Sequence, residues 1–378
     1  MVSESPPRGL QLRTLVTSTG TLKLELVDVA VPSPASDEVL VRVEAAPINP
    51  SDILLLLGTA DLETAQEGGT PDRPTLVCHL LRGGLRSMSA RLDQSLAAGN
   101  EGAGTVVSAG SDVTHALGKR VAMFGGAMYA EFRCLKLSEC MLLPEGSTAK
   151  DGASSFVNPL TALGMIETMR KEGHTALLHT AAASSLGQML NRICLMDGVN
   201  LVNIVRNVEQ EQTLRRQGAR YVCNSTSETF MTDLIDCVRE TRATIAFDAV
   251  GGGKLAGQIL TAMEAALNHS VKVFSPYGSA VHKQVYIYGG LDPGITQLSR
   301  GFGTAWGIGG WLLFPFLEKL GTNGLERLKA RVSGELNTTF ASQYTREISL
   351  QETITLEVVA AWNRRATGEK FLIVPSKS

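Results

Sequence analysis

The chain has 378 residues, of which 44% are hydrophobic, so it is long and apolar enough to form two domains with buried cores. Lysine and arginine total 35, against 37 aspartates and glutamates. The resulting net charge of −2 provides no broad positive field for a phosphate backbone, so nucleic acid is not an expected partner.

No segment has the features of a membrane span or of an export signal. The longest apolar run, residues 306–316, contains glycines and a proline and is much shorter than the roughly 20 residues that cross a bilayer. The first residues lack the apolar core and cleavage site of a secretory signal. We therefore expect no membrane association and a cytoplasmic location.

The cysteines do not form a metal-binding pattern. Zinc and iron–sulfur sites need Cys-x-x-Cys pairs or tight clusters, and the chain has neither. The six residues are Cys78, Cys134, Cys140, Cys194, Cys223 and Cys237. We expect reduced thiols, most of them in the core, and no bound metal.

The first third of the chain has the composition of β-strands. Dense β-branched or alternating apolar residues are separated by turn formers, which is typical of an antiparallel barrel or sandwich. The expected strands are residues 22–32, 38–48, 104–110, 119–125 and 128–135.

From about residue 152 the pattern changes to strands that alternate with helices. Repeated β-α-β units of this length predict a parallel sheet with helices on both faces. Strands are expected at residues 175–182, 201–207, 220–225, 244–253 and 284–290, and helices at 185–198, 209–219, 231–242 and 254–269.

The last forty residues resemble the first third again. Residues 338–350 have an extended pattern, 356–368 a helical one, and 370–375 form an apolar strand that we expect to pair with the first domain. The predicted domains are therefore residues 1–153 with 335–378, and an α/β domain at 154–334.

A cofactor site is indicated between the first strand and helix of the α/β domain. Residues 180–187 read TAAASSLG, and such small residues let the backbone approach a diphosphate at the positive end of a helix dipole. The usual glycines are replaced by Ala and Ser, with Gly187 retained. A packing turn without a ligand is therefore an equal alternative on this segment alone.

The end of the second strand bears on which dinucleotide binds. Many such strands end in an acidic residue that accepts hydrogen bonds from the ribose 2′-hydroxyl. This one ends with Arg206 and Asn207. A guanidinium suits a 2′-phosphate, which favours NADPH, although a solvated arginine after a strand is the alternative.

Seven sequence blocks resemble those of the zinc-independent medium-chain dehydrogenase/reductase superfamily, in particular its quinone oxidoreductases and enoyl-thioester reductases. The blocks occur in the family's order and span nearly the whole chain. The blocks are residues 46–52 (APINPSD), 99–106 (GNEGAGTV), 118–122 (GKRVA), 129–132 (YAEF), 158–162 (NPLTA), 248–252 (DAVGG) and 366–370 (ATGEK). The resemblance implies a GroES-like, partly open β-barrel catalytic domain and a doubly wound, Rossmann-type cofactor domain.

The resemblance also implies chemistry without zinc. Alcohol dehydrogenases of this superfamily hold catalytic zinc with a cysteine and a histidine where Asn49 and Asn100 stand here, and amides are poor zinc ligands. Without a Lewis acid the expected reaction is hydride transfer from NADPH to an acceptor that is already electron-poor, either a quinone or an alkene conjugated to a carbonyl.

The resemblance assigns site residues by position. It implies Asn49 and Thr161 as catalytic positions, with Thr161 near the nicotinamide, and a homodimer as the assembly. The implied cofactor-binding residues are Thr161, Ser184, Ser185, Leu186, Gly187, Arg206, Asn207, Val250, Gly251 and Gly289, and the implied substrate-pocket residues are Tyr129 and Trp306.

Two departures from the family limit the choice of acceptor. The tyrosine proposed as the proton donor of enoyl-thioester reductases is replaced by Ala60, so Tyr129, Tyr288 or a water would have to serve. This favours a quinone, with a 2-enoyl thioester reductase and a catalytically idle NADPH sensor as the alternatives.

The second departure is added sequence, at about residues 61–97 and at 269–283. The first addition carries Arg73, Arg82, Arg86 and Arg91. It is expected to be either an edge cover or dimer contact, or a lid that binds an anionic tail such as a CoA phosphate.

Overall fold

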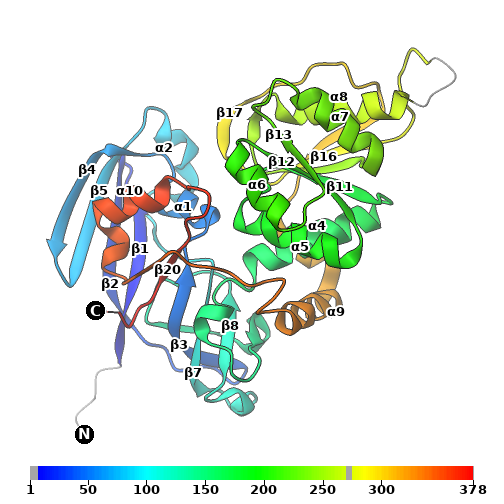
Figure 1. Cartoon of the computed structure of the whole chain (residues 1–378). Coiled ribbons are helices and arrows are strands. Elements are labelled where there is room, and N and C mark those ends of the chain that lie inside the picture. Colours follow the sequence, from blue (N-terminus) through cyan, green and yellow to red (C-terminus); the bar gives the residue numbers. More distant parts are fainter. Residues whose placement is uncertain (1–6, 270–274, 378) are drawn as a thin grey trace, which may run out of the picture. The chain divides into compact units, whose positions relative to one another are not determined.

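The computed structural model describes residues 7–269 and 275–377, coloured along the chain in Figure 1. It divides into two compact units. Unit 1 comprises Met1–Val157 and Lys329–Ser378, and unit 2 comprises Asn158–Leu328. Unit 1 is thus built from both ends of the chain, with unit 2 as an insertion between them.

The first sheet of unit 1 is antiparallel. Its strand order is β4 (Ala60–Thr70), β5 (Arg73–Leu80), β2 (Thr21–Ala30), β1 (Arg8–Val16) and β6 (Ser95–Ala97). Alternate residues of β2, among them Leu22 and Leu24, are fully buried, as expected for a strand with one face on the core.

The second sheet of unit 1 contains the C-terminal strand. Its order is β10 (Cys140–Leu142), β8 (Arg120–Phe124), β7 (Glu101–Ala109), β3 (Glu38–Pro47), β20 (Phe371–Ile373) and β19 (Arg346–Ile348), and β9 (Phe132–Lys136) also pairs with β3. Leu372 is opposite Pro47, which confirms the expected return of the last strand to the first domain. One hydrophobic core, with Leu12 of β1 and Val41 of β3, is shared by the two sheets.

Short helices complete unit 1. They are α1 (Pro50–Leu56), α2 (Gly84–Ser87), α3 (Ala149–Gly152) and α10 (Leu356–Asn363), with 3-10 turns at Ser89–Arg91, Thr114–Ala116, Leu137–Glu139 and Glu352–Ile354. The two sheets around one core confirm the GroES-like, partly open barrel.

The central sheet of unit 2 is entirely parallel. Its order is β13 (Tyr221–Asn224), β12 (Asn200–Val205), β11 (Ala176–His179), β14 (Ile245–Asp248), β16 (Lys283–Ile287) and β18 (Trp306–Gly310). When the six strands are numbered 1 to 6 along the chain, their order in the sheet is 3-2-1-4-5-6, which is the doubly wound dinucleotide-binding order. The topological switch point therefore lies between β11 and β14, and the expected Rossmann-type sheet is confirmed.

Helices cover both faces of this sheet, with α5 and α6 across it from α7 and α8 (Figure 1). The helices are α4 (Val157–Lys171), α5 (Ser185–Asp197), α6 (Val208–Arg216), α7 (Phe230–Thr241), α8 (Leu255–Asn268) and α9 (Leu313–Gly334). Every residue of β11 and β14 is buried, as expected of strands covered on both faces. A separate pair, β15 (Gly251–Gly253) and β17 (Asp292–Thr296), follows the carboxyl ends.

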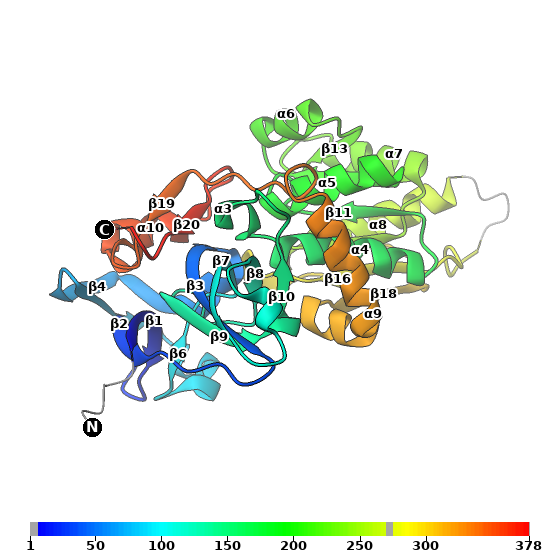
Figure 2. The same ribbon diagram turned by 90° about the horizontal axis from the view of Figure 1, so that it is seen from below.

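The first added segment extends a sheet of unit 1. Strands β4 and β5 form a hairpin, β5 pairs with β2, and β4 is the outer strand (Figure 2). The Glu67 carboxylate accepts a hydrogen bond of 2.6 Å from the Leu356 backbone N–H at the start of α10. The hairpin is therefore an edge extension of the sheet. Residues 270–274 of the second addition lie outside the described residues.

Candidate functional site

The turn after β11 provides the helix terminus that the sequence indicates. The Ser184 hydroxyl accepts a hydrogen bond of 3.1 Å from the Gly187 N–H and so caps α5. The N–H groups of Ser185 and Leu186, the first two helical residues, have no acceptor within the helix and are available to an anion.

Gly187 makes this turn tight. A Cβ at Gly187 would lie 2.2 Å from the Ala182 carbonyl oxygen, so no other residue fits without displacing the backbone. Ala181 takes the left-handed φ of 50° that a glycine would adopt more easily. The segment therefore has the close backbone approach of a diphosphate turn although most of its glycines are missing.

Two polar side chains fix the neighbouring turn after β14. The Thr180 hydroxyl donates to Asp248 Oδ1 at 2.7 Å and accepts from the Ala249 N–H at 2.8 Å. The Asp248 carboxylate also accepts from the N–H groups of Val250 and Gly251. Val250 and Gly251 are thereby held at the carboxyl edge of the sheet, beside the turn after β11.

Gly251 and Gly289 allow the two loops that follow β14 and β16 to pack closely at this edge. Gly251 has a φ of 79°, and a Cβ there would lie 2.8 Å from the Gly289 carbonyl oxygen. Both predicted glycines therefore lie at the carboxyl edge of the sheet, as the α5 terminus does.

The end of β12 presents Arg206 to solvent. Its backbone N–H donates to the Gln210 side-chain oxygen at 3.0 Å, and its carbonyl accepts from the Thr226 hydroxyl at 3.3 Å. Asn207 caps α6 by accepting from the Gln210 N–H. The backbone around Arg206 is thus held firmly, while the side chain is exposed.

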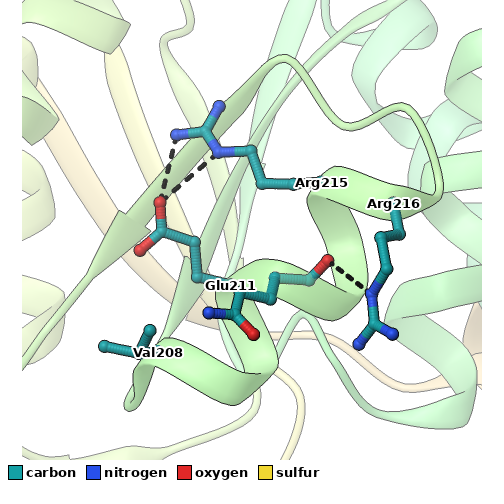
Figure 3. Close-up of a pocket in the computed structure, with 5 residues that line it drawn as sticks. Val208, Glu211, Arg215 and Arg216 are labelled. Atoms are coloured by element: carbon teal, nitrogen blue, oxygen red, sulfur yellow. Dashed lines mark hydrogen bonds and ion pairs between the residues drawn. The ribbon is translucent and has the colours of Figure 1, made fainter.

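Two other arginines near Arg206 have partners on their own helix. They border a shallow hollow on α6, shown in Figure 3 with Val208 and Glu211. Arg215 pairs with Glu211 at 3.2 Å, and Arg216 donates to the Gln212 carbonyl at 3.2 Å. Arg206 is therefore the better candidate for a phosphate contact.

A buried histidine and a tyrosine lie at the same carboxyl edge. His179, the last residue of β11, is fully buried, and its Nε2 lies 2.7 Å from the Tyr288 hydroxyl. Burial lowers the pKa of His179 to about 3, so the ring is neutral at physiological pH. Burial raises the pKa of Tyr288, so its hydroxyl stays protonated.

In unit 1, Asn49 is part of a buried polar cluster. Its side-chain Nδ2 donates to Glu101 Oε1 at 2.8 Å, while Glu101 Oε2 accepts from the N–H groups of Phe156 and Val157 at 2.9 Å. These bonds fix the orientation of the Asn49 amide. Its Oδ1 atom is buried and has no partner among the described residues.

Asp52 joins Asn49 to the other amide of the cluster. Its carboxylate accepts from the backbone N–H groups of Asn49 and Asn100, each at 2.8 Å, and burial raises its pKa to about 7. The Asn100 side-chain Nδ2 donates to Ser51. Both amides thus direct a nitrogen donor at a neighbouring oxygen.

Lys370 contributes the positive charge of this cluster. It is buried, its ammonium donates to the Ser154 hydroxyl at 2.7 Å, and it lies 5.3 Å from the centre of the Tyr344 ring. Burial lowers the pKa of Lys370 to about 8, while the carboxylates of Glu101 and Asp52 act in the opposite direction. Glu101, Asp52 and Lys370 lie within the family-like blocks of the sequence, but no pattern there assigns them a role. The available signal of a buried network was the position of each charged residue within or beside an apolar segment.

The two predicted substrate-pocket residues lie in different units, Tyr129 in unit 1 and Trp306 in unit 2. Tyr129 is fully buried, and its hydroxyl donates to the Pro47 carbonyl at 2.9 Å. Trp306 begins β18 opposite Lys283, the first residue of β16, so it lies at the amino edge of the sheet. That edge is opposite to the α5 terminus, and the pocket role of Trp306 stays a prediction. Thr161 lies buried in α4.

Comparisons with known proteins agree with this geometry. A family model, the alcohol dehydrogenase GroES-like domain, matches residues 35–176. A solved structure from Mesorhizobium loti, assigned to the NADPH:quinone reductases, is 26% identical, with a TM-score of 0.74 over 98% of this chain and 100% of that one. The chain therefore has a GroES-like domain and a Rossmann-type sheet, and it is similar to an NADPH:quinone reductase along nearly its whole length.

Two further proteins are similar over less sequence or at lower identity. A mitochondrial enoyl-[acyl-carrier-protein] reductase of Caenorhabditis elegans is 27% identical over 255 residues, which span 64% of this chain and 64% of that relative. Escherichia coli quinone oxidoreductase, solved with NADPH, shares the fold at 17% identity, with a TM-score of 0.68 over 98% of this chain and 100% of that one. Within the described residues, no helix is long and apolar enough to cross a membrane.

Proposed function

We propose that this protein belongs to the medium-chain dehydrogenase/reductase superfamily and is an NADPH-dependent, zinc-independent reductase that transfers a hydride to a quinone or to an activated alkene. The observation that carries the proposal is the carboxyl edge of the unit 2 sheet. There the free N–H groups of Ser185 and Leu186 and the exposed Arg206 follow two adjacent parallel strands. Such an edge suits a diphosphate and a 2′-phosphate.

The residues fit the cofactor on independent grounds. Gly187 keeps the turn tight, because a Cβ there would meet the Ala182 carbonyl oxygen at 2.2 Å, and the two residues that directly follow β12, Arg206 and Asn207, are not acidic. NADPH would supply the hydride. Thr180 and Asp248 would hold the turn on which the cofactor rests, and Asn49 and Thr161 would position the reactants.

The choice of acceptor is supported by the missing tyrosine. Ala60 carries no proton, and the Tyr129 hydroxyl is committed to the Pro47 carbonyl. A quinone has less need of a precisely placed acid than an enoyl thioester does, which favours a quinone. The similarity to enoyl-[acyl-carrier-protein] reductases supports 2-enoyl thioesters as the second acceptor class.

The test is consumption of NADPH by the purified full-length chain with 1,4-benzoquinone, 9,10-phenanthrenequinone, crotonyl-CoA and 2-alkenals. Arg206→Ala is expected to raise the KM for NADPH by about 10–100-fold, as for loss of a hydrogen bond to a charged group, with the KM for NADH unchanged. Arg239→Ala, which removes an exposed arginine paired with Asp236 on α7, is the matched control.

Each outcome decides between the candidates. Turnover of quinones supports the proposal, and turnover of crotonyl-CoA alone selects the enoyl reductase. A melting temperature that rises with NADPH, without turnover of any acceptor, indicates a binding protein. Absence of NADPH binding refutes the proposal.

We also propose a homodimer and a cytoplasmic location. The dimer is supported by β18, the edge strand of the unit 2 sheet, and by Leu312 just beyond it, which is 64% exposed. Light scattering should give twice the chain mass, and Leu312→Glu should lower it. The location stays a prediction from the N-terminal sequence.

A further inference from the structure

Two thiols of unit 2 lie next to each other. Cys223, in β13, is buried, and Cys237, in α7, is half-buried. The Cys223 S–H donates to the Cys237 sulfur at an Sγ–Sγ distance of 3.5 Å. Both cysteines are free.

This geometry lies close to that of a disulfide. A bond of about 2.05 Å requires the two sulfur atoms to approach by roughly 1.5 Å, a movement within the reach of side-chain rotation. Helix α7 follows β13 directly and packs against it, so the two backbones are already adjacent. No rearrangement of the sheet is needed.

The two thiols differ in reactivity. The hydrogen bond from Cys223 lowers the pKa of Cys237, and the Arg215 guanidinium acts in the same direction. That hydrogen bond and burial raise the pKa of Cys223. Asp233 and Glu240 oppose ionisation of Cys237, but the pKa still falls. Cys237 is therefore the nucleophile, and it is also the more accessible thiol.

We propose that Cys223 and Cys237 form a dithiol–disulfide couple that exchanges with small disulfides. The Cys237 thiolate attacks one sulfur of the small disulfide, forms a mixed disulfide and releases one small thiolate. Cys223 then loses its proton and attacks the Cys237 sulfur, which releases the second small thiolate. The protein loses two electrons and two protons, and the small disulfide is reduced to two thiols.

The couple lies next to the strand that leads to Arg206. Cys223 is paired with Ile204 of β12, the Ser225 N–H donates to the Val205 carbonyl, and the Thr226 hydroxyl donates to the Arg206 carbonyl. A disulfide would tie α7 to this segment. We therefore expect the oxidised chain to bind NADPH with a different Kd, an expectation that rests on the proposed function.

The experiment treats the full chain with glutathione disulfide and maps its peptides without reduction. The expected product links Cys223 to Cys237. Cys223→Ser should stop at a stable mixed disulfide on Cys237, and Cys237→Ser should form neither product. Cys134→Ser, which removes a half-buried thiol of unit 1, is the control and should leave the linkage intact.

Free thiols at both positions, or a mixed disulfide that persists in the unsubstituted chain, would overturn the couple. Titration of the reduced and the oxidised chain with NADPH tests separately whether the disulfide changes the Kd. The Cys237→Ser variant, which cannot form the disulfide, is the control. Equal Kd values for the two forms would overturn the link to Arg206. Absence of NADPH binding in both forms would instead refute the proposed function, because the linkage is measured without NADPH.

Discussion

Glu101 shows how one buried carboxylate can organise several groups. It accepts from the Asn49 side chain and from two backbone N–H groups just before and at the start of α4. Burial raises the pKa of Glu101, while these donors and the Lys370 charge lower it. The orientation of Asn49 therefore depends on a residue 52 positions further along the chain.

We predict that Glu101→Gln lowers the free energy of unfolding by about 1–3 kcal/mol, because the new side chain has one acceptor oxygen for three N–H donors and no negative charge for the buried Lys370. Urea unfolding measures the change. Glu357→Gln, at an exposed position on α10, should have no measurable effect. Equal stability of Glu101→Gln and the unsubstituted chain would contradict the hydrogen-bond pattern.

His179 predicts a pH dependence of stability. Its pKa is about 3 in the folded chain and near 6.5 when solvated. Between pH 3 and pH 6.5 the His179 ring binds a proton in the unfolded chain but not in the folded one. Its contribution to the free energy of unfolding is therefore complete above pH 6.5 and is lost as the pH falls toward 3. The slope is at most about 1.4 kcal/mol per pH unit.

Urea unfolding from pH 7 to pH 4.5 should therefore show a smaller loss of stability in His179→Gln than in the unsubstituted chain. Tyr288→Phe removes the hydroxyl partner but retains the buried ring of His179, so it should keep most of the slope. Parallel pH profiles of the His179→Gln variant and the unsubstituted chain would show that His179 is solvated.

Among the elements, α8 and β16 are joined by a buried ion pair. Lys283 and Glu264 lie 2.7 Å apart, with side chains 0% and 5% exposed. Removal of one partner leaves an uncompensated charge, so Lys283→Met should destabilise the fold by about 3–5 kcal/mol. The double variant Glu264→Gln/Lys283→Met should recover part of this loss.

Denaturant unfolding measures both changes. Lys150→Met, which breaks an exposed pair with Glu347, should cost less than about 1 kcal/mol. A similar cost for Lys283→Met would show that water reaches the buried pair.

The elements also show what the sequence could predict. The parallel sheet was predictable because β11, β12 and β14 are short apolar runs with regular helices between them. The β4–β5 hairpin was not predictable, because β4 reads ADLETAQEGGT, with charged residues and glycines that disfavour strands. The hairpin forms because β5 pairs with β2 in the antiparallel sheet.

The same distinction applies to the candidate site. The turn at Ser184–Gly187 and Arg206 follow local patterns, so the sequence suggested them, and their binding roles stay predictions. The clusters around Glu101 and His179 join residues that are far apart along the chain, for which no local pattern exists. The pocket role of Trp306 is implied by the family resemblance alone, and no local pattern shows that Trp306 begins a strand at the amino edge of the sheet.

For the whole molecule, the division of unit 1 between two chain segments makes its stability depend on β20. Phe371, Leu372 and Ile373 are buried, and each such side chain contributes about 1.5–3 kcal/mol. Truncation after Gly368 should therefore unfold unit 1 and leave unit 2 folded. Truncation after Val374 keeps the strand and should preserve both units.

Limited proteolysis with mass spectrometry distinguishes these results. A protected fragment near residues 158–328 is expected from the shorter chain alone. Full protection of residues 8–157 in that chain would show that unit 1 does not need its last strand.

The pairing of Leu372 with Pro47 has a consequence for biosynthesis. Strand β3 leaves the ribosome early, whereas β20 leaves it only after all of unit 2 has been made. Unit 2 is continuous and can fold as it emerges, so the unit that starts first is completed last. Until then, the edge of β3 that β20 will cover is available to chaperones and to neighbouring nascent chains.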